Sequence, residues 1–229
     1  MLFLSPRLAA AAGLLDGGKT VADVGTDHAY IPAYLIQSGK CTHVIASDIG
    51  GKPLENARQT LRKYGLEEQI ELRISDGLRA YAPAEAEEIC ICGMGGTLIA
   101  EILAAAPWIL RPGMHLVLQP MTHSEDVRAF LCGHGFVLRR EVCVAEGRRR
   151  VYCCISADWT GKTEPVPAGF SYFGTLLRQE DAAAKAFVKK QYLRVKKRAD
   201  ALSGAGIHPE EEAALREVIG YYFENGGEV

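Results

Sequence analysis

The sequence lacks any apolar run long enough to cross a membrane. Its longest apolar stretches, residues 8–15 and 99–106, fall well short of the roughly 20 residues that a bilayer requires. The residues around Arg7 also lack the basic-then-apolar layout of a secretory signal. Net charge is small, with 26 basic and 28 acidic side chains among 229 residues, and 48% of the residues are hydrophobic, which excludes a mainly disordered chain. These features predict a soluble cytoplasmic protein.

The sequence also lacks a recognisable metal-binding pattern. None of the seven cysteines forms a Cys-x-x-Cys pair, and no His/Cys knuckle with zinc-ligand spacing is present. Cys90 and Cys92 should face one side of a predicted strand, whereas the adjacent Cys153 and Cys154 should face opposite sides. The pattern is typical of small core residues in a reducing compartment, and no metal is expected.

Short apolar strands alternate with helices over residues 1–159. The predicted strands are 20–24, 43–48, 70–75, 89–92 and 115–119, and the predicted helices are 5–15, 31–38, 53–64, 97–106 and 124–134. Two further strands, 137–145 and 150–156, are joined by a turn at Gly147. The alternation predicts an α/β fold with a mostly parallel, twisted sheet, covered on both faces and ending in an antiparallel hairpin.

The pattern changes after Trp159. Residues 160–169 are rich in glycine and proline and are predicted to be a linker, and residues 170–229 should form a C-terminal helical hairpin. Residues 170–203 carry 8 basic and 3 acidic side chains, whereas residues 206–229 carry 1 basic and 6 acidic ones. Attraction between the two helices explains this segregation as well as a phosphate-binding arm does.

The unusual loops of the first 159 residues all follow predicted strands. They are residues 25–28, 47–48, 75–77, 93–96 and 119–121. The carboxyl ends of parallel strands meet at one rim of the sheet, where α/β proteins bind their ligands. Five such loops at one rim predict a binding site there.

The first of these loops differs from a dinucleotide-binding fingerprint. Residues 23–27 contain one glycine in place of three, and Asp27 would repel a pyrophosphate. Asp48 is placed to accept hydrogen bonds from ribose hydroxyls, and Asp76 to contact an adenine edge while the Gly77 backbone passes beneath the ring. These features favour S-adenosyl-L-methionine over NAD and argue against an NAD-linked oxidoreductase.

Several of these motifs resemble one enzyme family. Residues 23–32 (Asp-Val-Gly-Thr-Asp-His-Ala-Tyr-Ile-Pro), the preceding Leu-Ser-x-Arg-Leu of residues 4–8, the Gly-Met-Gly-Gly of 93–96 and the Leu-Gln-Pro of 118–120 resemble the bacterial tRNA adenine-22 N1-methyltransferases. The resemblance covers residues 2–159 and implies a Rossmann-like domain that methylates N1 of an adenine in the tRNA D-arm. The chain departs from the family at Met121, where the family usually has asparagine. The predicted cofactor-binding residues are Asp23, Gly25, Asp48, Ile49, Asp76, Gly77, Gly93 and Met94.

The chemistry of this reaction points to Asp27 as the catalytic residue. Adenine N1 attacks through an in-plane lone pair and needs no base, but the ring becomes cationic, so a nearby carboxylate would stabilise it. The alternative is that Asp27 only caps the following helix. His28 and Tyr30 could contact the base, or serve structural roles. The predicted substrate-binding residues are Arg7, His28, Tyr30, Gln119, Lys189, Lys190, Lys196 and Lys197.

The predicted partner is therefore tRNA, bound by a chain for which a monomer is favoured. The Arg148-Arg149-Arg150 run adds further candidate phosphate contacts. Two other functions stay open: a methyltransferase acting on a protein or small molecule, and a non-catalytic RNA-binding protein that retains the cofactor pocket.

Overall fold

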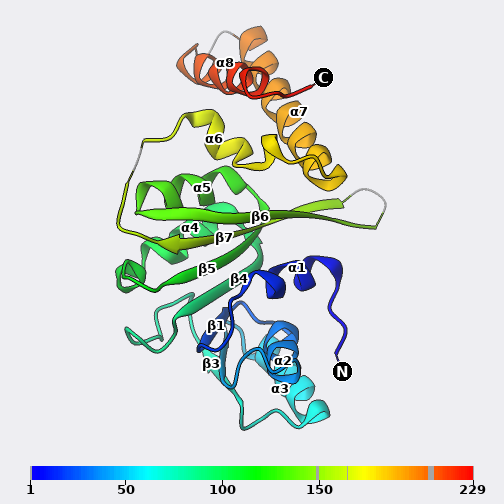
Figure 1. Ribbon diagram of the computed structural model, residues 1–229, viewed down its shortest axis with the longest axis vertical. Helices are drawn as coiled ribbons and strands as arrows, with labels where there is room; N and C mark the ends of the chain where they lie inside the picture. Colours follow the sequence, from blue (N-terminus) through cyan, green and yellow to red (C-terminus); the bar gives the residue numbers. More distant parts are fainter. Residues whose placement is uncertain (1, 148–149, 164, 206–208, 229) are drawn as a thin grey trace.

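The computed structural model describes residues 2–147, 150–163, 165–205 and 209–228 (Figure 1). The strands are β1 (Val21–Val24), β2 (Val44–Asp48), β3 (Ile70–Ile74), β4 (Glu88–Gly95), β5 (His115–Thr122), β6 (Phe136–Glu146) and β7 (Arg150–Trp159). The helices are α1 (Pro6–Leu14), α2 (Tyr30–Gln37), α3 (Gly51–Tyr64), α4 (Gly96–Ala104), α5 (Ser124–Gly133), α6 (Ala168–Phe173), α7 (Ala182–Ala205) and α8 (Pro209–Glu224). Two short 3-10 turns are η1 (Pro107–Ile109) and η2 (Leu176–Arg178).

The strands form one sheet in the order β3-β2-β1-β4-β5-β7-β6. All pairings from β3 to β5 are parallel, and β7 runs antiparallel to both β5 and β6. The strand order reverses between β1 and β4, which creates the switch point at which open α/β sheets bind ligands. The predicted α/β sheet with a terminal antiparallel hairpin is confirmed.

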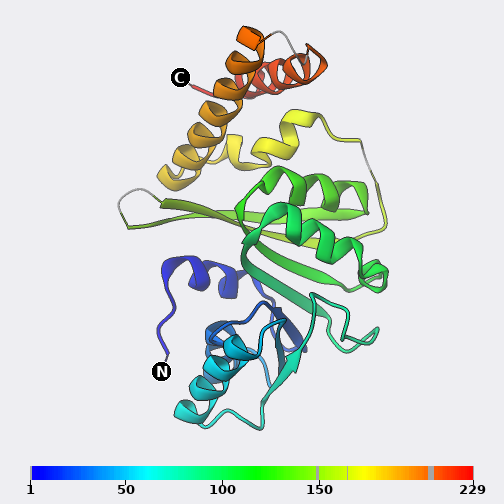
Figure 2. The ribbon, with the colours of Figure 1, turned by 180° about the vertical axis from the view of Figure 1, so that it is seen from behind.

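Each face of the sheet has its own hydrophobic core. Helices α1, α2 and α3 cover one face, while α4, α5 and then the C-terminal helices cover the other (Figures 1 and 2). Neighbouring strand residues enter opposite cores, as Cys153 and Cys154 do, because successive side chains of a strand point to opposite faces. Cys90 and Cys92 share a face, as predicted, with their sulfur atoms 3.6 Å apart.

Two of the predicted rim loops are instead the ends of strands. β4 continues to Gly95 and β5 to Thr122, with a shifted register that pairs Met94 with Pro120. Glycine and proline are uncommon inside strands, so the bounds predicted from the sequence for both strands end too early. A side chain at Gly96 would overlap with the backbone of His123, so the two chain ends pack closely here.

The C-terminal helical hairpin is present, but the segment before it differs from the prediction. Tyr192 of α7 stacks on Tyr222 of α8 with ring centroids 4.3 Å apart. A continuous helix over residues 170–203 is wrong, because α6 ends at Phe173 and the chain turns at Gly174, where φ is +59°. α6 also takes the last two residues of the predicted linker.

The described part of the chain contains no helix that is long and apolar enough to cross a membrane. The seven cysteines, all of which lie in described ranges, are free thiols. Within the same ranges, no cluster of three or more His, Cys, Asp or Glu side chains is arranged to hold a metal ion.

Candidate functional site

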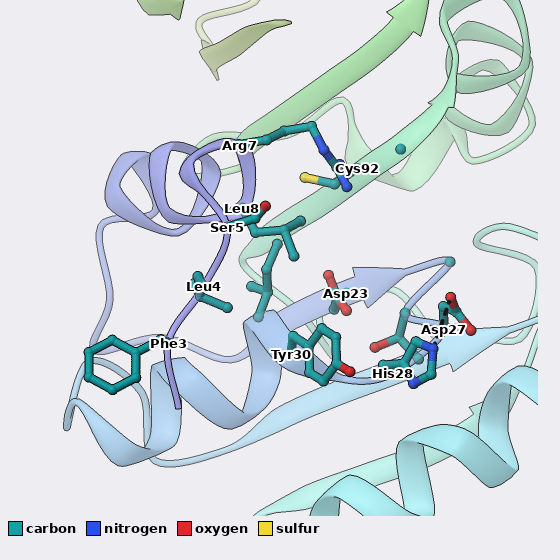
Figure 3. Close-up of a pocket in the computed structure, with 14 residues that line it drawn as sticks. Phe3, Leu4, Ser5, Arg7, Leu8, Asp23, Asp27, His28, Tyr30 and Cys92 are labelled. Carbon is teal, nitrogen blue, oxygen red and sulfur yellow. Dashed lines mark ion pairs between the residues drawn. The ribbon is translucent and has the colours of Figure 1, made fainter. Parts of the chain in front are cut away.

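A cavity of about 470 Å³ opens where β1 ends, between α1 and the start of α2 (Figure 3). Its walls come from the segment before α1, from β1 and the loop that follows it, and from the end of β4. Several residues predicted from the sequence line it together: Arg7, Asp23, Gly25, Asp27, His28, Tyr30 and Gly93. The structure therefore brings most of the predicted N-terminal site residues to one cavity.

The loop after β1 is shaped by left-handed backbone. Gly25 has a φ of +77°, and the backbone N–H groups of Gly25 and Thr26 both donate to the carbonyl of Ser47 at the end of β2, at 2.8 and 2.9 Å. Asp27 and Ala29 also have positive φ values, of 46° and 53°, which cost non-glycine residues free energy. Such unfavourable conformations cluster at functional sites, and here they set the direction of Asp27 and His28.

Asp27 is one of the residues that line the cavity, and its carboxylate lies beside His28 at one end of it (Figure 3). Its side chain is 61% exposed, its Oδ2 lies 3.6 Å from Nε2 of His28, and its Oδ1 accepts a long hydrogen bond of 3.4 Å from Nδ2 of Asn56 on α3. The His28 ring stacks on Tyr30, with centroids 5.1 Å apart and planes 9° apart. Ala29 occupies the N-cap position of α2, so the contacts favour a role for Asp27 in the cavity over helix capping.

Asp23 is a second carboxyl group on the same cavity wall, but it is buried. Only 5% of the residue is exposed, and burial raises the pKa of Asp23 to about 6, although Thr26 and Cys90 favour its ionised form. The nearby Asp48 carboxylate raises this pKa further. No cationic group is among the described residues that shift the pKa of Asp23, so this buried carboxyl group on a cavity wall is suited to a positively charged ligand.

The remaining predicted cofactor residues extend the rim beyond this cavity. Asp48 ends β2 and uses Oδ1 to accept a hydrogen bond of 2.9 Å from the Gly50 backbone, while the following Ile49 is 70% exposed. The backbone N–H of Ser75 donates to the carbonyl of Asp48, which brings the loop containing Asp76 beside β2. Asp76 lines a separate cavity of about 250 Å³, and a side chain at Gly77 would collide with Ile102 of α4.

The end of β4 packs against the first loop. A side chain at Gly25 would overlap with the Met94 methyl group, so Met94 contacts the loop and Gly25 makes room for it. Gly93, with a φ of +84°, lies beside the Arg7 guanidinium. Met94 and Gly93 therefore form the side of the site that faces β1.

Gln119 is fully buried, and its amide is engaged within the chain. Its Oε1 accepts hydrogen bonds from Nη1 of Arg7 at 2.6 Å and from the Gly93 backbone at 3.2 Å, and its Nε2 donates to the Pro120 carbonyl at 2.9 Å. The Arg7 guanidinium also lies over the Tyr152 ring, 5.7 Å from its centroid. In this arrangement both predicted substrate residues fix the rim, and contact with a substrate stays a prediction for each.

The predicted lysines lie apart from this cavity, on the exposed surface of α7. Lys189 lines a separate cavity with Tyr222 and Glu228, and Lys196 forms an ion pair with Asp200 at 2.8 Å. Lys190 and Lys197 are exposed on another face of the helix. The predicted contacts at Arg148 and Arg149 lie outside the described residues, and Arg150 begins β7.

Sequence reasoning missed several residues that line the cavity: Phe3, Leu4, Ser5, Leu8, Thr26, Ile31 and Cys92. It also missed Asn56, which contacts Asp27 from α3. Leu4 and Leu8 belong to the Leu-Ser-x-Arg-Leu motif, and the motif was the available signal that this segment borders the site.

Comparison with known proteins places this geometry in a family. Residues 4–155 match a family described as a methyltransferase domain. The chain is 39% identical over 145 residues to the tRNA (adenine(22)-N(1))-methyltransferase of Bacillus subtilis, a match that covers 63% of this chain and 61% of that protein. The match to this relative thus spans less than two thirds of its length.

Two solved structures resemble the whole fold. The B. subtilis m1A22 tRNA methyltransferase TrmK is 28% identical, with a TM-score of 0.85 over 99% of this chain and 100% of that one. M. capricolum TrmK in complex with S-adenosyl-homocysteine is 25% identical, with a TM-score of 0.79 over 95% of this chain and 97% of that one. Since the methyltransferase domain covers about two thirds of the sequence and the sequence motifs agree with it, the chain belongs to the methyltransferase family that includes the tRNA (adenine-22-N1)-methyltransferases.

Proposed function

We propose that this protein transfers a methyl group from S-adenosylmethionine to N1 of adenine 22 in the D-arm of tRNA. The observation that carries the proposal is the pair of carboxyl groups on one cavity wall at the switch point, Asp23 buried and Asp27 exposed. The similarity to relatives named as m1A22 tRNA methyltransferases supports it.

The residues at the rim fit S-adenosylmethionine. When bound, this cofactor supplies an electrophilic methyl group on a positively charged sulfur. Asp23 offers negative potential for a cationic ligand, and the single-glycine loop has no cradle for a pyrophosphate. Asp48, whose Oδ1 is used by the Gly50 backbone, would accept hydrogen bonds from ribose hydroxyls, and Asp76 with Gly77 would border the adenine.

Asp27 then stabilises the charge that develops on the target base. Adenine N1 is unprotonated at neutral pH and attacks directly, so the protein needs to align the base and favour its cationic form. The carboxylate of Asp27 accepts a hydrogen bond from the exocyclic amine, and Asn56 and His28 limit its rotation. The base must leave its stack to expose N1, and Tyr30, which is 40% exposed, is available to contact it.

Methyl transfer to a defined transcript tests this function. The full chain, radiolabelled S-adenosylmethionine and a tRNA transcript should yield 1-methyladenosine, detected by nucleoside mass spectrometry, and a transcript with guanine at position 22 should yield none. Label incorporated only into a protein or metabolite fraction would instead support a methyltransferase that acts on a protein or small molecule. Binding of tRNA with no transfer to any fraction would support a non-catalytic RNA-binding protein.

The affinity for S-adenosylmethionine should fall as the pH drops through about 6. Below this pH Asp23 is protonated and neutral in the free protein, so a cation must displace the proton, and the dissociation constant rises by up to tenfold per pH unit. Calorimetry at pH 5.5 in two buffers of different ionisation enthalpy should show proton release. Asp23→Asn should bind weakly and without this pH dependence; an unchanged pH dependence in that variant would contradict the assignment.

Two faces of α7 offer different candidate contacts for tRNA. Lys190, Arg194 and Lys197 follow each other at helical spacing on one face. Arg194 reaches Glu125 of α5 at 2.7 Å, so this face borders the helix that begins where β5 ends at the rim. Lys189 lies on a different face, where it lines a cavity together with Tyr222 of α8.

Charge reversal at Lys190 and Lys197 should therefore weaken tRNA binding more than charge reversal at Lys189 and Lys196. Both double variants have the same net charge, so only the position of the phosphate contacts differs. Fluorescence anisotropy over a salt series should show a loss of about tenfold or more and a shallower salt dependence for the first pair. Equal losses would show that the effect depends on net charge alone, and cofactor affinity should be unchanged in both variants.

A further inference from the structure

Phe3 is an aromatic residue at one end of the cavity, and it has no role in the proposed methyl transfer. Phe3 lines the cavity and is 93% exposed. Figure 3 shows Phe3 at one end of the cavity and Asp27 with His28 at the other, with Tyr30 between them. An exposed phenylalanine on a surface is common, so its significance here depends on how it is held and what lies beside it.

The residues on both sides of Phe3 are held by contacts with the rest of the protein. The Leu2 N–H donates to Oε1 of Gln37 on α2 at 2.8 Å, and the side chains of Leu2 and Leu4 pack against the core beneath α1 and α2. In an extended segment successive side chains point in opposite directions, so two inward neighbours force Phe3 outward. The ring is therefore displayed by a restrained segment at the mouth of the cavity.

The chemistry of the proposed tRNA substrate suggests which group would stack on the Phe3 ring. Extrusion of an adenine from its stack removes a stacking partner from the bases next to it. Phe3 has a π face and no hydrogen-bonding group, so it would recognise the face of any base without reading its sequence. The ring lies at the opposite end from Asp27, which places it beyond the target base.

We propose that Phe3 is a stacking platform for a nucleobase adjacent to the target adenine. This inference rests on the proposed function, because it requires that an RNA base enters the cavity. It adds a substrate contact outside the reacting centre: Phe3 holds the strand next to the extruded base and has no part in the methyl transfer itself.

Steady-state kinetics of three variants with full tRNA test the proposal. Phe3→Ala should raise KM for tRNA by about 5- to 100-fold, the range expected for one stacked base, with kcat at saturating tRNA and the dissociation constant of S-adenosylmethionine unchanged. Phe3→Trp should retain wild-type KM, and Phe3→Leu, which keeps apolar area without a π face, should lose most of the affinity. Val137→Ala, which shortens another exposed apolar side chain on β6, should behave as wild type.

A spectroscopic signature separates stacking from a general packing effect. A tRNA with 2-aminopurine next to position 22 should change fluorescence on binding to the wild type and to Phe3→Trp, and change less with Phe3→Ala. Unchanged KM in Phe3→Ala, full activity of Phe3→Leu, or a weakened cofactor affinity in Phe3→Ala would each overturn the proposal. A wild-type protein that fails to methylate tRNA would instead refute the proposed function.

Discussion

Replacement of Asp27 by asparagine is expected to lower kcat for methyl transfer by about 100- to 1,000-fold. The amide keeps the size of the side chain but removes the negative charge that opposes the positive charge on the methylated ring, and loss of one preorganised electrostatic group costs about this much. Because the carboxylate is 61% exposed and its contacts with Asn56 and His28 are long, the substitution should leave folding intact. Single-turnover kinetics with bound cofactor measure the chemical step directly.

The controls for this variant separate charge from position. Glu68→Gln removes one negative charge from the exposed turn before β3, at the amino ends of the parallel strands and so away from the rim, and should retain wild-type rates. The dissociation constant of S-adenosylmethionine should change little in Asp27→Asn, because Asp23 and Asp48, not Asp27, are the residues proposed to contact the cofactor. A rate within threefold of wild type would remove Asp27 from the mechanism and favour a local structural role in the strained loop.

The sequence predicts the fold well where local pattern and tertiary structure agree. Most strands and helices are within three residues of their predicted bounds, because each strand is an apolar run and the helices begin or end near glycine or proline. The differences that remain depend on contacts between residues distant in the sequence. The turn at Gly174 lies against Glu141 of β6, and the extended ends of β4 and β5 depend on pairing Met94 with Pro120. Neither contact can be predicted from residues that are close together in the sequence.

In the candidate site, too, some residues could be placed from the local sequence and others depend on distant contacts. The loop around Asp27 was predictable because parallel strands bring their carboxyl ends to one rim. The wall that contains Phe3 could not be placed, since it depends on a hydrogen bond between Leu2 and Gln37 of another helix. Gln119 was predicted to bind the substrate, and that role stays a prediction; its hydrogen bonds to Arg7 and Gly93 join three elements and are visible only in the structure.

A buried ion pair joins the sheet to the helices that follow it. Arg128 of α5 donates through Nε to Oε1 of Glu141 on β6 at 2.7 Å, and both side chains are completely buried. Arg128 Nη1 donates to the carbonyl groups of Ser171 and Tyr172, and Oε2 of Glu141 accepts from the Thr175 backbone at 2.6 Å. Burial alone would lower the pKa of Arg128, but the Glu141 carboxylate raises it, so Arg128 stays protonated.

Removal of either partner should be strongly destabilising. Arg128→Met or Glu141→Gln leaves one charge buried without its counterion, which costs about 3–5 kcal/mol. For a chain of this size that loss corresponds to a fall in Tm of about 6–20 °C, measured by thermal unfolding followed by circular dichroism. The exposed pair Arg58–Glu55 on α3 is the matched control: Arg58→Met should cost less than about 1 kcal/mol.

The double variant Arg128→Met/Glu141→Met distinguishes a buried charge from a general loss of packing. If the penalty of each single variant is the uncompensated charge, removal of both charges should recover most of the lost stability. Recovery should stay incomplete, because the Thr175 N–H and the Ser171 carbonyl lose partners in a site that excludes water. Additive losses in the double variant would contradict this account and assign the effect to packing at the junction of α5, β6 and α6. Thr175 directly follows Gly174, so recovery in the double variant would also show that the turn after α6 tolerates the loss of this ion pair.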